Sequence, residues 1–223
     1  MKITILTLFP EMFAPLQHSI VKRATDAGHL TVELVNFRDY TDDKHKRVDD
    51  YSYSGGAGMV LRAQPIVDCI EAIDPKRQAH RILMTPAAPV LTQARVTELA
   101  TKPHVIILCG HYEGVDQRAI DLCIDEVVSI GDYVLTGGEL PAMVLADAVA
   151  RHVPGVLNAA SLNTESHNPD NRLLEHPHYT RPQEYRGLTV PAVLTSGNHA
   201  KIEEWKRAES LAVTRRLRAD LLG

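Results

Sequence analysis

The stretch Ile130-Gly131-Asp132-Tyr133-Val134-Leu135-Thr136-Gly137-Gly138-Glu139-Leu140-Pro141 joins two apolar segments. It follows the run Glu126–Ile130 and leads into a helical pattern that ends at Arg151. Its three glycines let backbone N–H and C=O groups approach a ligand without intervening side chains. A second glycine-bearing loop follows the apolar run His104–Cys109. The two loops together predict a binding pocket lined by backbone.

The first two thirds of the chain alternate apolar runs with helical patterns. Buried strands are predicted at Lys2–Leu8, Thr31–Phe37, Arg81–Thr85, His104–Cys109 and Glu126–Ile130. Helices are predicted at Glu11–Ala27, Pro65–Ile73, Thr92–Thr101, Val115–Ile124 and Leu140–Arg151. This alternation indicates an α/β fold, with a mostly parallel sheet covered by helices on both faces. Ligands of such sheets bind at the carboxyl ends of the strands, where both glycine loops lie.

The composition changes after residue 157. The segment Asn158–Asn171 is polar and has short side chains, which is typical of a flexible linker. Residues 176–182 and 188–194 are predicted to be extended, and a final helix is predicted to begin after Asn198 as its N-cap. The apolar stripe of this helix is expected to consist of Ile202, Trp205, Ala208 and Ala212. Glu203 and Arg207 are expected to form an i,i+4 ion pair on it. We predict a domain at 1–157, a linker at 158–172 and a small helical C-terminal domain at 173–223.

The overall composition is that of an ordinary soluble protein. Of 223 residues, 44% are hydrophobic and 23% are charged, and no run of about 18 apolar residues predicts a membrane span. The segment Met1–Pro10 is interpreted as a first buried strand instead of a signal peptide. Cys69, Cys109 and Cys123 are odd in number and lie in apolar runs, which suits a reducing cytoplasm.

The charge distribution is uneven. A net charge of −4 argues against a protein that coats nucleic acid non-specifically, but it allows a local basic surface. Basic residues cluster at Lys44–Arg47 and at Arg215, Arg216 and Arg218. Taken alone, each cluster is most simply a solvated surface.

Several familiar motifs are missing. The chain has no G-x-x-x-x-G-K-[ST] phosphate loop, and its first strand leads to Phe9-Pro10 and not to the glycine turn of a dinucleotide site. The segment Tyr53–Met59 is rich in glycine but lacks the dinucleotide spacing. We predict an ordered loop there that packs closely against another part of the molecule.

The histidines and cysteines give little support to a metal site or a thiol nucleophile. His176 with His178, and His104 with His111, lack the spacing of known metal motifs and are predicted to be structural or surface residues. Cys109 is predicted to be a buried structural cysteine.

The charged residues near the glycine loops allow two interpretations each. Glu113, Asp116 and Asp132 either cap turns or bind a ribose or an amine. Arg151, at the end of a predicted helix, complements the helix dipole unless it has a further role.

Seven ordered motifs cover nearly the whole chain. They are Thr7–Pro10, Val48–Asp50, Gly55–Met59, Cys109–Gly114, Ile130–Pro141, Pro177–Pro182 and Ser196–His199. On these motifs the chain resembles the bacterial tRNA (guanine-N1)-methyltransferases of the SPOUT-type knotted superfamily, which methylate guanosine 37 beside the anticodon. The resemblance implies a deep trefoil knot, a homodimer with a composite active site, tRNA as substrate and S-adenosylmethionine as cofactor.

The resemblance also implies residue roles. The cofactor residues would be Met84, Thr85, Pro86, Gly110, Tyr112, Glu113, Ile130, Gly131, Asp132, Tyr133, Val134, Leu135, Gly137 and Gly138. The substrate residues would be Asp49, Asp50, Gly55, Gly56, Gly58, Met59, Arg215 and Arg216. Arg151 matches the catalytic arginine, and the linker carboxylate is either Glu165 or Asp170. His111 stands where the family commonly has arginine, and Ala57 where it commonly has proline.

The resemblance implies separate catalytic roles for the linker carboxylate and for Arg151. The linker carboxylate would take the proton from N1 of guanine, and Arg151 would stabilise negative charge on O6. Two other classes remain open: a non-catalytic RNA- or nucleotide-binding module of the same fold, and a metal-dependent phosphohydrolase using His104, His111, Asp116 and Asp132. A requirement for Mg²⁺ is also left open.

Overall fold

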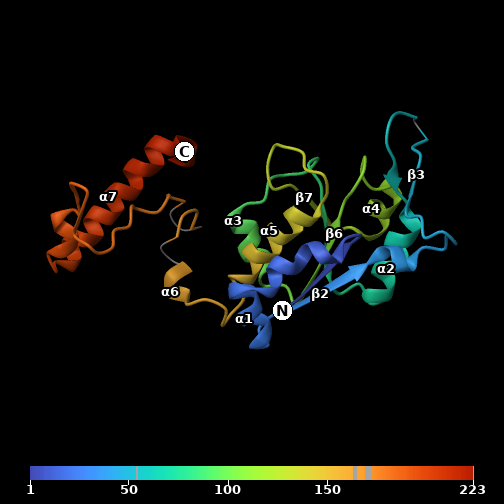
Figure 1. The fold of residues 1–223 in the computed structure, drawn as a ribbon, viewed down its shortest axis with the longest axis horizontal. Helices are drawn as coiled ribbons and strands as arrows, with labels where there is room; N and C mark the ends of the chain where they lie inside the picture. The colour runs from blue at the N-terminus through green and yellow to red at the C-terminus, as the bar shows by residue number, and fades with distance from the viewer. Residues whose placement is uncertain (54, 163–164, 169–171, 223) are drawn as a thin grey trace. The chain divides into compact units, whose positions relative to one another are not determined.

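The computed structural model describes residues 1–53, 55–162, 165–168 and 172–222 (Figure 1). Contacts between residues divide the chain into two compact units, Met1–Leu157 and Asn158–Gly223.

The first unit is built on a five-stranded sheet. Its strands are β1 (Lys2–Thr7), β2 (Thr31–Asn36), β5 (His80–Met84), β6 (His104–Cys109) and β7 (Glu126–Val128). They lie in the order β2-β1-β6-β5-β7, and each neighbouring pair is parallel. Because β1 and β6 lie inside the sheet and are buried on both faces, their sequences are largely apolar. The predicted parallel sheet is confirmed, with strand ends displaced by at most two residues.

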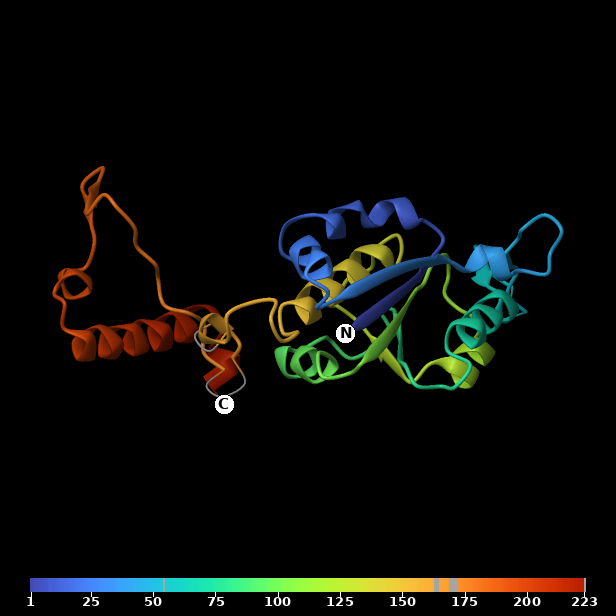
Figure 2. The same ribbon diagram turned by 90° about the horizontal axis from the view of Figure 1, so that it is seen from below.

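Helices cover both faces of this sheet, as the views in Figures 1 and 2 show. One face packs against the 3₁₀ helix η1 (Pro10–Gln17) and against α1 (Ser19–Asp26), α3 (Gln93–Leu99) and α5 (Glu139–Ala150). The other face packs against η2 (Phe37–Tyr40), α2 (Ala63–Ile73) and α4 (Gln117–Cys123). The two cores meet opposite sides of the same strands, since Ile5 belongs to the first core and Leu6 to the second.

The single helix predicted at Glu11–Ala27 is wrong. The chain forms η1 and then α1, and His18 between them is extended, with φ −131° and ψ 167°. Ser19 then takes a positive φ of 54°. Pro15 lies inside η1, where it has no N–H to donate. An apolar period alone does not reveal this break, because both pieces bury residues on the same side.

A short hairpin that the sequence did not predict carries the glycine-rich loop. Its strands are β3 (Asp49–Asp50) and β4 (Val60–Leu61), and they pair in antiparallel fashion. Beside it, the backbone N–H of Glu113 donates to the carbonyl of Met59 at 2.9 Å, and that of Leu61 donates to the carbonyl of Gly114 at 2.9 Å. The close packing predicted for this loop is therefore seen at its Met59 end.

The second unit contains α6 (Ala159–Leu162), β8 (Glu184–Tyr185), β9 (Leu188–Thr189), η3 (Ala192–Thr195), α7 (His199–Leu217) and η4 (Ala219–Leu222) (Figure 2). The Asn198 side chain accepts from the backbone N–H of Lys201 at 3.2 Å, which confirms it as the N-cap of α7. Glu203 pairs with Lys206 at 2.6 Å, three residues away, so the chain uses a nearer lysine than the predicted Arg207.

The predicted apolar stripe of α7 is only half right. Ile202 and Trp205 are half-buried, but Ala208 and Ala212 are exposed. The face that packs continues instead to Thr214, which is fully buried and whose hydroxyl accepts from the backbone N–H of Leu174 at 2.9 Å. The buried face of this helix thus includes a polar contact to the segment at Leu174, and apolar spacing does not predict such a contact.

Among the described residues, no helix combines the length and the apolar character that crossing a bilayer requires.

Candidate functional site at the carboxyl edge of the sheet

A cavity of about 680 Å³ lies at the carboxyl ends of β5, β6 and β7. Its walls come from the loops that follow these three strands and from the start of α5. The lining residues are Leu83 to Ala87, Gly110 to Val115, Gln117, Ile120, Val127 to Ile130, Tyr133 to Gly138, and Pro141. This is the position at which ligands of parallel α/β sheets bind.

Most of the predicted cofactor residues line this cavity. Those that do are Met84, Thr85, Pro86, Gly110, Tyr112, Glu113, Ile130, Tyr133, Val134, Leu135, Gly137 and Gly138. Gly131 and Asp132 are absent from the lining, although they belong to the same loop. Asp132 is exposed there.

Close backbone contact between the two glycine loops explains why position 138 is a glycine. The N–H of Gly138 donates to the carbonyl of Gly110 at 2.8 Å. A Cβ atom at Gly138 would lie 2.7 Å from both Cys109 Cα and Gly110 N. Since these are backbone atoms that cannot move independently, only glycine fits. Main-chain contact thus holds the two glycine loops together beside the cavity.

Apolar side chains surround the mouth of the cavity. Tyr112, Tyr133 and Val134 are 51%, 56% and 80% exposed, and Leu135 is 38% exposed. Large exposed apolar side chains grouped around a concave site are typical of a place where a ligand or a partner binds.

Beside the cavity, a carboxylate is buried on the α5 side. Glu139 is only 1% exposed, and it accepts from the Thr7 hydroxyl at 2.7 Å and from His111 Nε2 at 2.7 Å. Sequence reasoning assigned no individual role to Thr7 or Glu139, although they lie within the motifs Thr7–Pro10 and Ile130–Pro141. The three residues come from β1, from the loop after β6 and from α5, so no spacing along the chain could connect them.

The two interpretations of the acidic residues can now be separated for Asp116. This residue is the N-cap of α4, where its carboxylate accepts from the backbone N–H of Arg118 at 2.9 Å and pairs with the Arg118 guanidinium at 2.6 Å. These hydrogen bonds lower the pKa of the Asp116 carboxyl. Its role is capping. Glu113 instead lines the cavity with its carboxylate exposed.

All three cysteines are buried. Burial, and then the charge of Glu139, raises the pKa of the Cys109 thiol well above its usual value. Burial likewise raises the pKa of Cys69 to about 12 and that of Cys123 to about 11. Because the thiolate is the nucleophile, these groups are unreactive, and the structural interpretation of Cys109 is confirmed.

The histidines and acids of the phosphohydrolase hypothesis do not come together. His104 begins β6 and His111 lies two residues beyond its end, so the length of this six-residue strand, about 20 Å, lies between them. Asp116 is occupied as a helix cap. Within the part of the chain that the structure describes, no group of three or more histidine, cysteine or acidic side chains is placed to hold a metal ion.

Arg151 also lies away from the cavity. It is the C-cap of α5, and the cavity-lining Gly138 is the N-cap of the same helix. The 12 residues between them span about 18 Å. Arg151 does make an interaction, so it is not a free surface charge.

The other predicted site residues are spread over both units. Asp50, Gly55, Gly56 and Gly58 are exposed in the β3–β4 hairpin and its loop, and Met59 is half-buried. Glu165 is half-buried in the second unit, whereas Asp170 lies outside the described residues. Arg215 and Arg216 are exposed in the last turn of α7.

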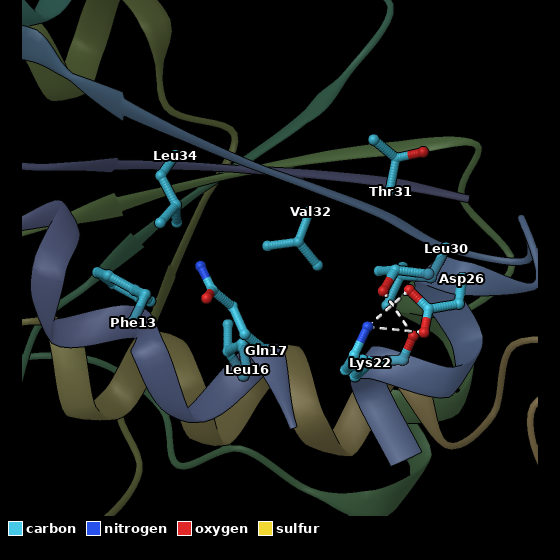
Figure 3. A pocket seen from close by; sticks show the side chains of 10 residues that line it. Phe13, Leu16, Gln17, Lys22, Asp26, Leu30, Thr31, Val32 and Leu34 are labelled. Atoms are coloured by element: carbon cyan, nitrogen blue, oxygen red, sulfur yellow. Dashed lines mark hydrogen bonds and ion pairs between the residues drawn. The ribbon is translucent and has the colours of Figure 1, made fainter. Parts of the chain in front are cut away.

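A second hollow, of about 460 Å³, lies beside the edge strand β2 (Figure 3). Phe13 and Leu16 of η1 and Val32 and Leu34 of β2 give it apolar walls, and the Lys22–Asp26 ion pair of α1 lies at one end. It contains none of the predicted site residues.

The fold and the carboxyl-edge cavity define an α/β protein with a candidate small-molecule site between glycine loops. The family model described as "tRNA (Guanine-1)-methyltransferase TrmD" matches residues 1–223. The chain therefore belongs to the tRNA (guanine-1)-methyltransferase family, a family of enzymes, and the predicted membership is confirmed.

Relatives in several bacteria agree with this assignment. A tRNA (guanine-N(1)-)-methyltransferase of Carboxydothermus hydrogenoformans is 52% identical and is aligned over 100% of this chain and 87% of that protein. Proteins with the same name in Bacillus pumilus and Clostridioides difficile are 52% and 48% identical. Those alignments cover 100% and 99% of this chain, and 92% and 97% of the respective relatives.

Proposed function

We propose that this chain transfers a methyl group from S-adenosylmethionine to N1 of guanosine 37 in tRNA. The observation that carries the proposal is the carboxyl-edge cavity, whose walls are the loops of the family motifs Cys109–Gly114 and Ile130–Pro141. The proposal includes the deep trefoil knot, a tRNA-binding C-terminal domain at 173–223 joined by the linker 158–172, and action in the cytoplasm, where tRNA is used.

The cavity fits the proposed methyl donor. Its volume of about 680 Å³ lies within the 300–1,000 Å³ that is usual for small-molecule sites. Backbone groups elsewhere in the loops that line the cavity can hydrogen-bond an adenine edge, and the exposed Glu113 carboxylate can accept from an amino group. S-adenosylmethionine would supply a methyl group activated by a positively charged sulfur.

The protein must then remove the N1 proton of guanine and stabilise charge on O6. A carboxylate of the linker, Glu165 or Asp170, is the proposed general base, and Arg151 is the proposed partner of O6. General-base catalysis is typically worth about 10²–10⁴ in rate, so its loss should lower kcat far more than donor affinity. The guanine must also leave its stack in the anticodon loop, which costs a few kcal/mol.

A composite site between two subunits would reconcile these roles with the distances in one chain. Arg151 and Gly138 lie at opposite ends of α5, about 18 Å apart, so one chain does not bring this arginine to its own cavity. Leu140 and Val144, four residues apart on α5, are 49% and 48% exposed. These two exposed apolar side chains lie one turn apart on a helix whose opposite face is buried, which favours contact with a second copy of the chain.

Sedimentation experiments test the dimer. We expect the purified protein to sediment as a dimer and the double substitution Leu140→Glu with Val144→Glu to yield monomers without activity. Leu122→Glu, at a 58% exposed leucine on α4, is the matched control and should remain dimeric. A wild-type monomer at working concentration would contradict the composite site.

The decisive experiment for the activity uses unmodified tRNA and labelled S-adenosylmethionine. Nucleoside analysis should find 1-methylguanosine, and a transcript with adenosine in place of guanosine 37 should accept no label. Parallel reactions with Mg²⁺ and with EDTA decide whether the metal is needed. Label in any other nucleoside, or none at all, would overturn the proposal.

Two substitutions assign the base. Glu165→Gln and Asp170→Asn should differ, with one lowering kcat by about 10² or more while donor affinity is kept. Full turnover in both variants would remove the general-base proposal. The alternative function, a non-catalytic RNA- or nucleotide-binding module, predicts tRNA binding without methyl incorporation in the wild-type protein.

A further inference from the structure

Glu139 is a buried carboxylate beside the cavity that takes no part in the proposed catalytic steps. Glu139 is the first residue of α5, and its side chain is 1% exposed. One carboxylate oxygen accepts from the Thr7 hydroxyl, and the other accepts from His111 Nε2, each at 2.7 Å. The Thr7 hydroxyl in turn accepts from the backbone N–H of Phe9 at 2.9 Å. The carboxylate therefore connects the end of β1, the loop after β6 and the start of α5.

The two glycine loops meet at the same place. Gly137 and His111 form an isolated antiparallel bridge, and Gly138 donates to the Gly110 carbonyl at 2.8 Å. A Cβ atom at Gly137 would overlap both the His111 ring and the Glu139 carboxylate. The absence of a side chain at Gly137 therefore leaves room for the contact between His111 and Glu139.

The electrostatics of the contact depend on the histidine proton. A buried carboxylate is costly unless it is paired, and a hydrogen bond from a charged donor is roughly twice as strong as one between neutral groups. Protonated His111 gives Glu139 a charged partner, whereas neutral His111 leaves it only neutral donors. Histidine is the one side chain whose ordinary titration lies between about pH 5 and 8.

The other groups around the ring do not replace that charge. The Phe9 ring lies 5.1 Å from the His111 ring and carries no charge, and the Tyr112 ring lies 6.0 Å away. Cys109, behind the pair, is a buried thiol. The neighbouring Glu113 is a carboxylate and is exposed.

We propose that Thr7, His111 and Glu139 form a positioning network that holds the two glycine loops in the arrangement that binds the donor, and that protonation of His111 tightens it. The inference rests on the proposed use of the cavity for S-adenosylmethionine. Neither His111 nor Glu139 takes part in proton transfer to or from guanine. They act through the position of the loop backbone.

Binding of S-adenosylhomocysteine, measured by calorimetry between pH 5.5 and 8, tests the proposal without turnover. Wild-type affinity should fall as the pH rises. His111→Arg, which keeps a permanent charge, should bind with affinity nearly independent of pH, and His111→Gln should bind at least about tenfold more weakly than wild type at pH 5.5. Glu139→Gln should weaken binding and also lose the pH dependence.

A matched control uses His104, the histidine that begins β6. His104 Nε2 donates to the Thr4 hydroxyl at 3.0 Å, at the opposite end of the same strand. His104→Gln should therefore keep the wild-type affinity and pH dependence. If His111→Gln matches His104→Gln in both respects, the network has no positioning role.

A second readout needs no ligand. Hydrogen exchange of the Gly138 amide should become faster in His111→Gln than in His104→Gln at the same pH, because the Gly138–Gly110 hydrogen bond opens more often. Equal protection in the two variants would overturn the proposal even where a variant binds no ligand.

The outcomes also separate this inference from the proposed function. Donor binding with the expected pH dependence, but without 1-methylguanosine in tRNA, would contradict the activity and support the network. Formation of 1-methylguanosine by the wild-type protein, together with unchanged donor affinity in His111→Gln, would support the activity and contradict the network. A wild-type protein that binds no donor would overturn both.

Discussion

The two edges of the parallel sheet use similar polar residues in different ways. At the amino edge, the Thr4 hydroxyl donates to Glu33 at 3.1 Å and accepts from His104 at 3.0 Å. At the carboxyl edge, the Thr7 hydroxyl donates to Glu139, which also accepts from His111. Both sets contain a threonine of β1, a glutamate and a histidine of the β6 region.

Their surroundings make the difference. Glu33 also pairs with Lys2 at 2.8 Å, and this contact, followed by the Thr4 hydroxyl, lowers the pKa of Glu33. At the amino edge, the polar side chains of neighbouring strands thus pair with one another. The carboxyl-edge group lies between glycine loops beside a cavity of about 680 Å³. The amino-edge groups satisfy one another within the sheet, whereas we propose that the carboxyl-edge groups hold loop backbone at a binding site.

The largest expected effect is at the amino edge and concerns stability alone. Asp74 and Arg81 form a buried ion pair at 2.7 Å, with side chains 6% and 3% exposed. Asp74→Ala leaves the arginine buried without its partner and should lower the free energy of unfolding by about 3–5 kcal/mol. Denaturant titration measures this loss, and calorimetry should find donor affinity unchanged in the folded protein.

The control for this variant is Asp26→Ala. Its ion pair with Lys22 is exposed, with side chains 60% and 54% accessible, so it should cost no more than about 1 kcal/mol. Equal losses in the two variants would contradict the structural role assigned to Asp74.

At the carboxyl edge, Gly138→Ala should affect binding as well as stability. The new Cβ would lie 2.7 Å from the backbone of Cys109 and Gly110, so the loops must move apart. We expect a loss of about 1–3 kcal/mol in stability and a loss of at least about tenfold in donor affinity. Gly28→Ala, before β2, meets open space at φ +76° and should lose only about 1 kcal/mol of stability, with donor affinity kept. Normal donor binding by Gly138→Ala would refute the backbone cradle.

A smaller effect is expected where the hairpin loop contacts the cavity. Gly56 and Gly58 both have positive φ, +101° and +92°, so alanine strains the backbone at either position. Only at Gly58 would the new Cβ also meet the Glu113 carboxylate. Because that side chain can shift, Gly58→Ala should weaken donor binding a few-fold relative to Gly56→Ala. Identical affinities would show that Glu113 does not contact the donor.

The smallest effect is a pH dependence at the amino edge. Burial, and then the charge of Lys2, lowers the pKa of His104 below its usual 6.5. The unfolded chain therefore binds this proton more readily than the folded one, and the contribution to stability, full above pH 6.5, is lost as the pH falls through the lowered pKa. Thermal unfolding between pH 7 and 5 should show less acid destabilisation in His104→Gln than in wild type. A steeper loss in the variant would contradict this sign.

Much of the fold could be predicted from local patterns, because strands buried on both faces are written as apolar runs such as His104–Cys109. The break at His18 could not be predicted in this way, since the buried side continues through it. The carboxyl-edge cavity could be anticipated from the glycines of the motif Ile130–Pro141. The roles of Thr7 and Glu139 could not, because these residues are 132 positions apart and meet only after the sheet has formed.

The most direct test of the account is a crystal structure of the protein with S-adenosylhomocysteine bound. We expect the ligand at the carboxyl edge of the sheet, between the loop that contains Gly110 and the loop that ends at Gly138. A ligand bound instead in the hollow beside β2, or on the second unit, would contradict it.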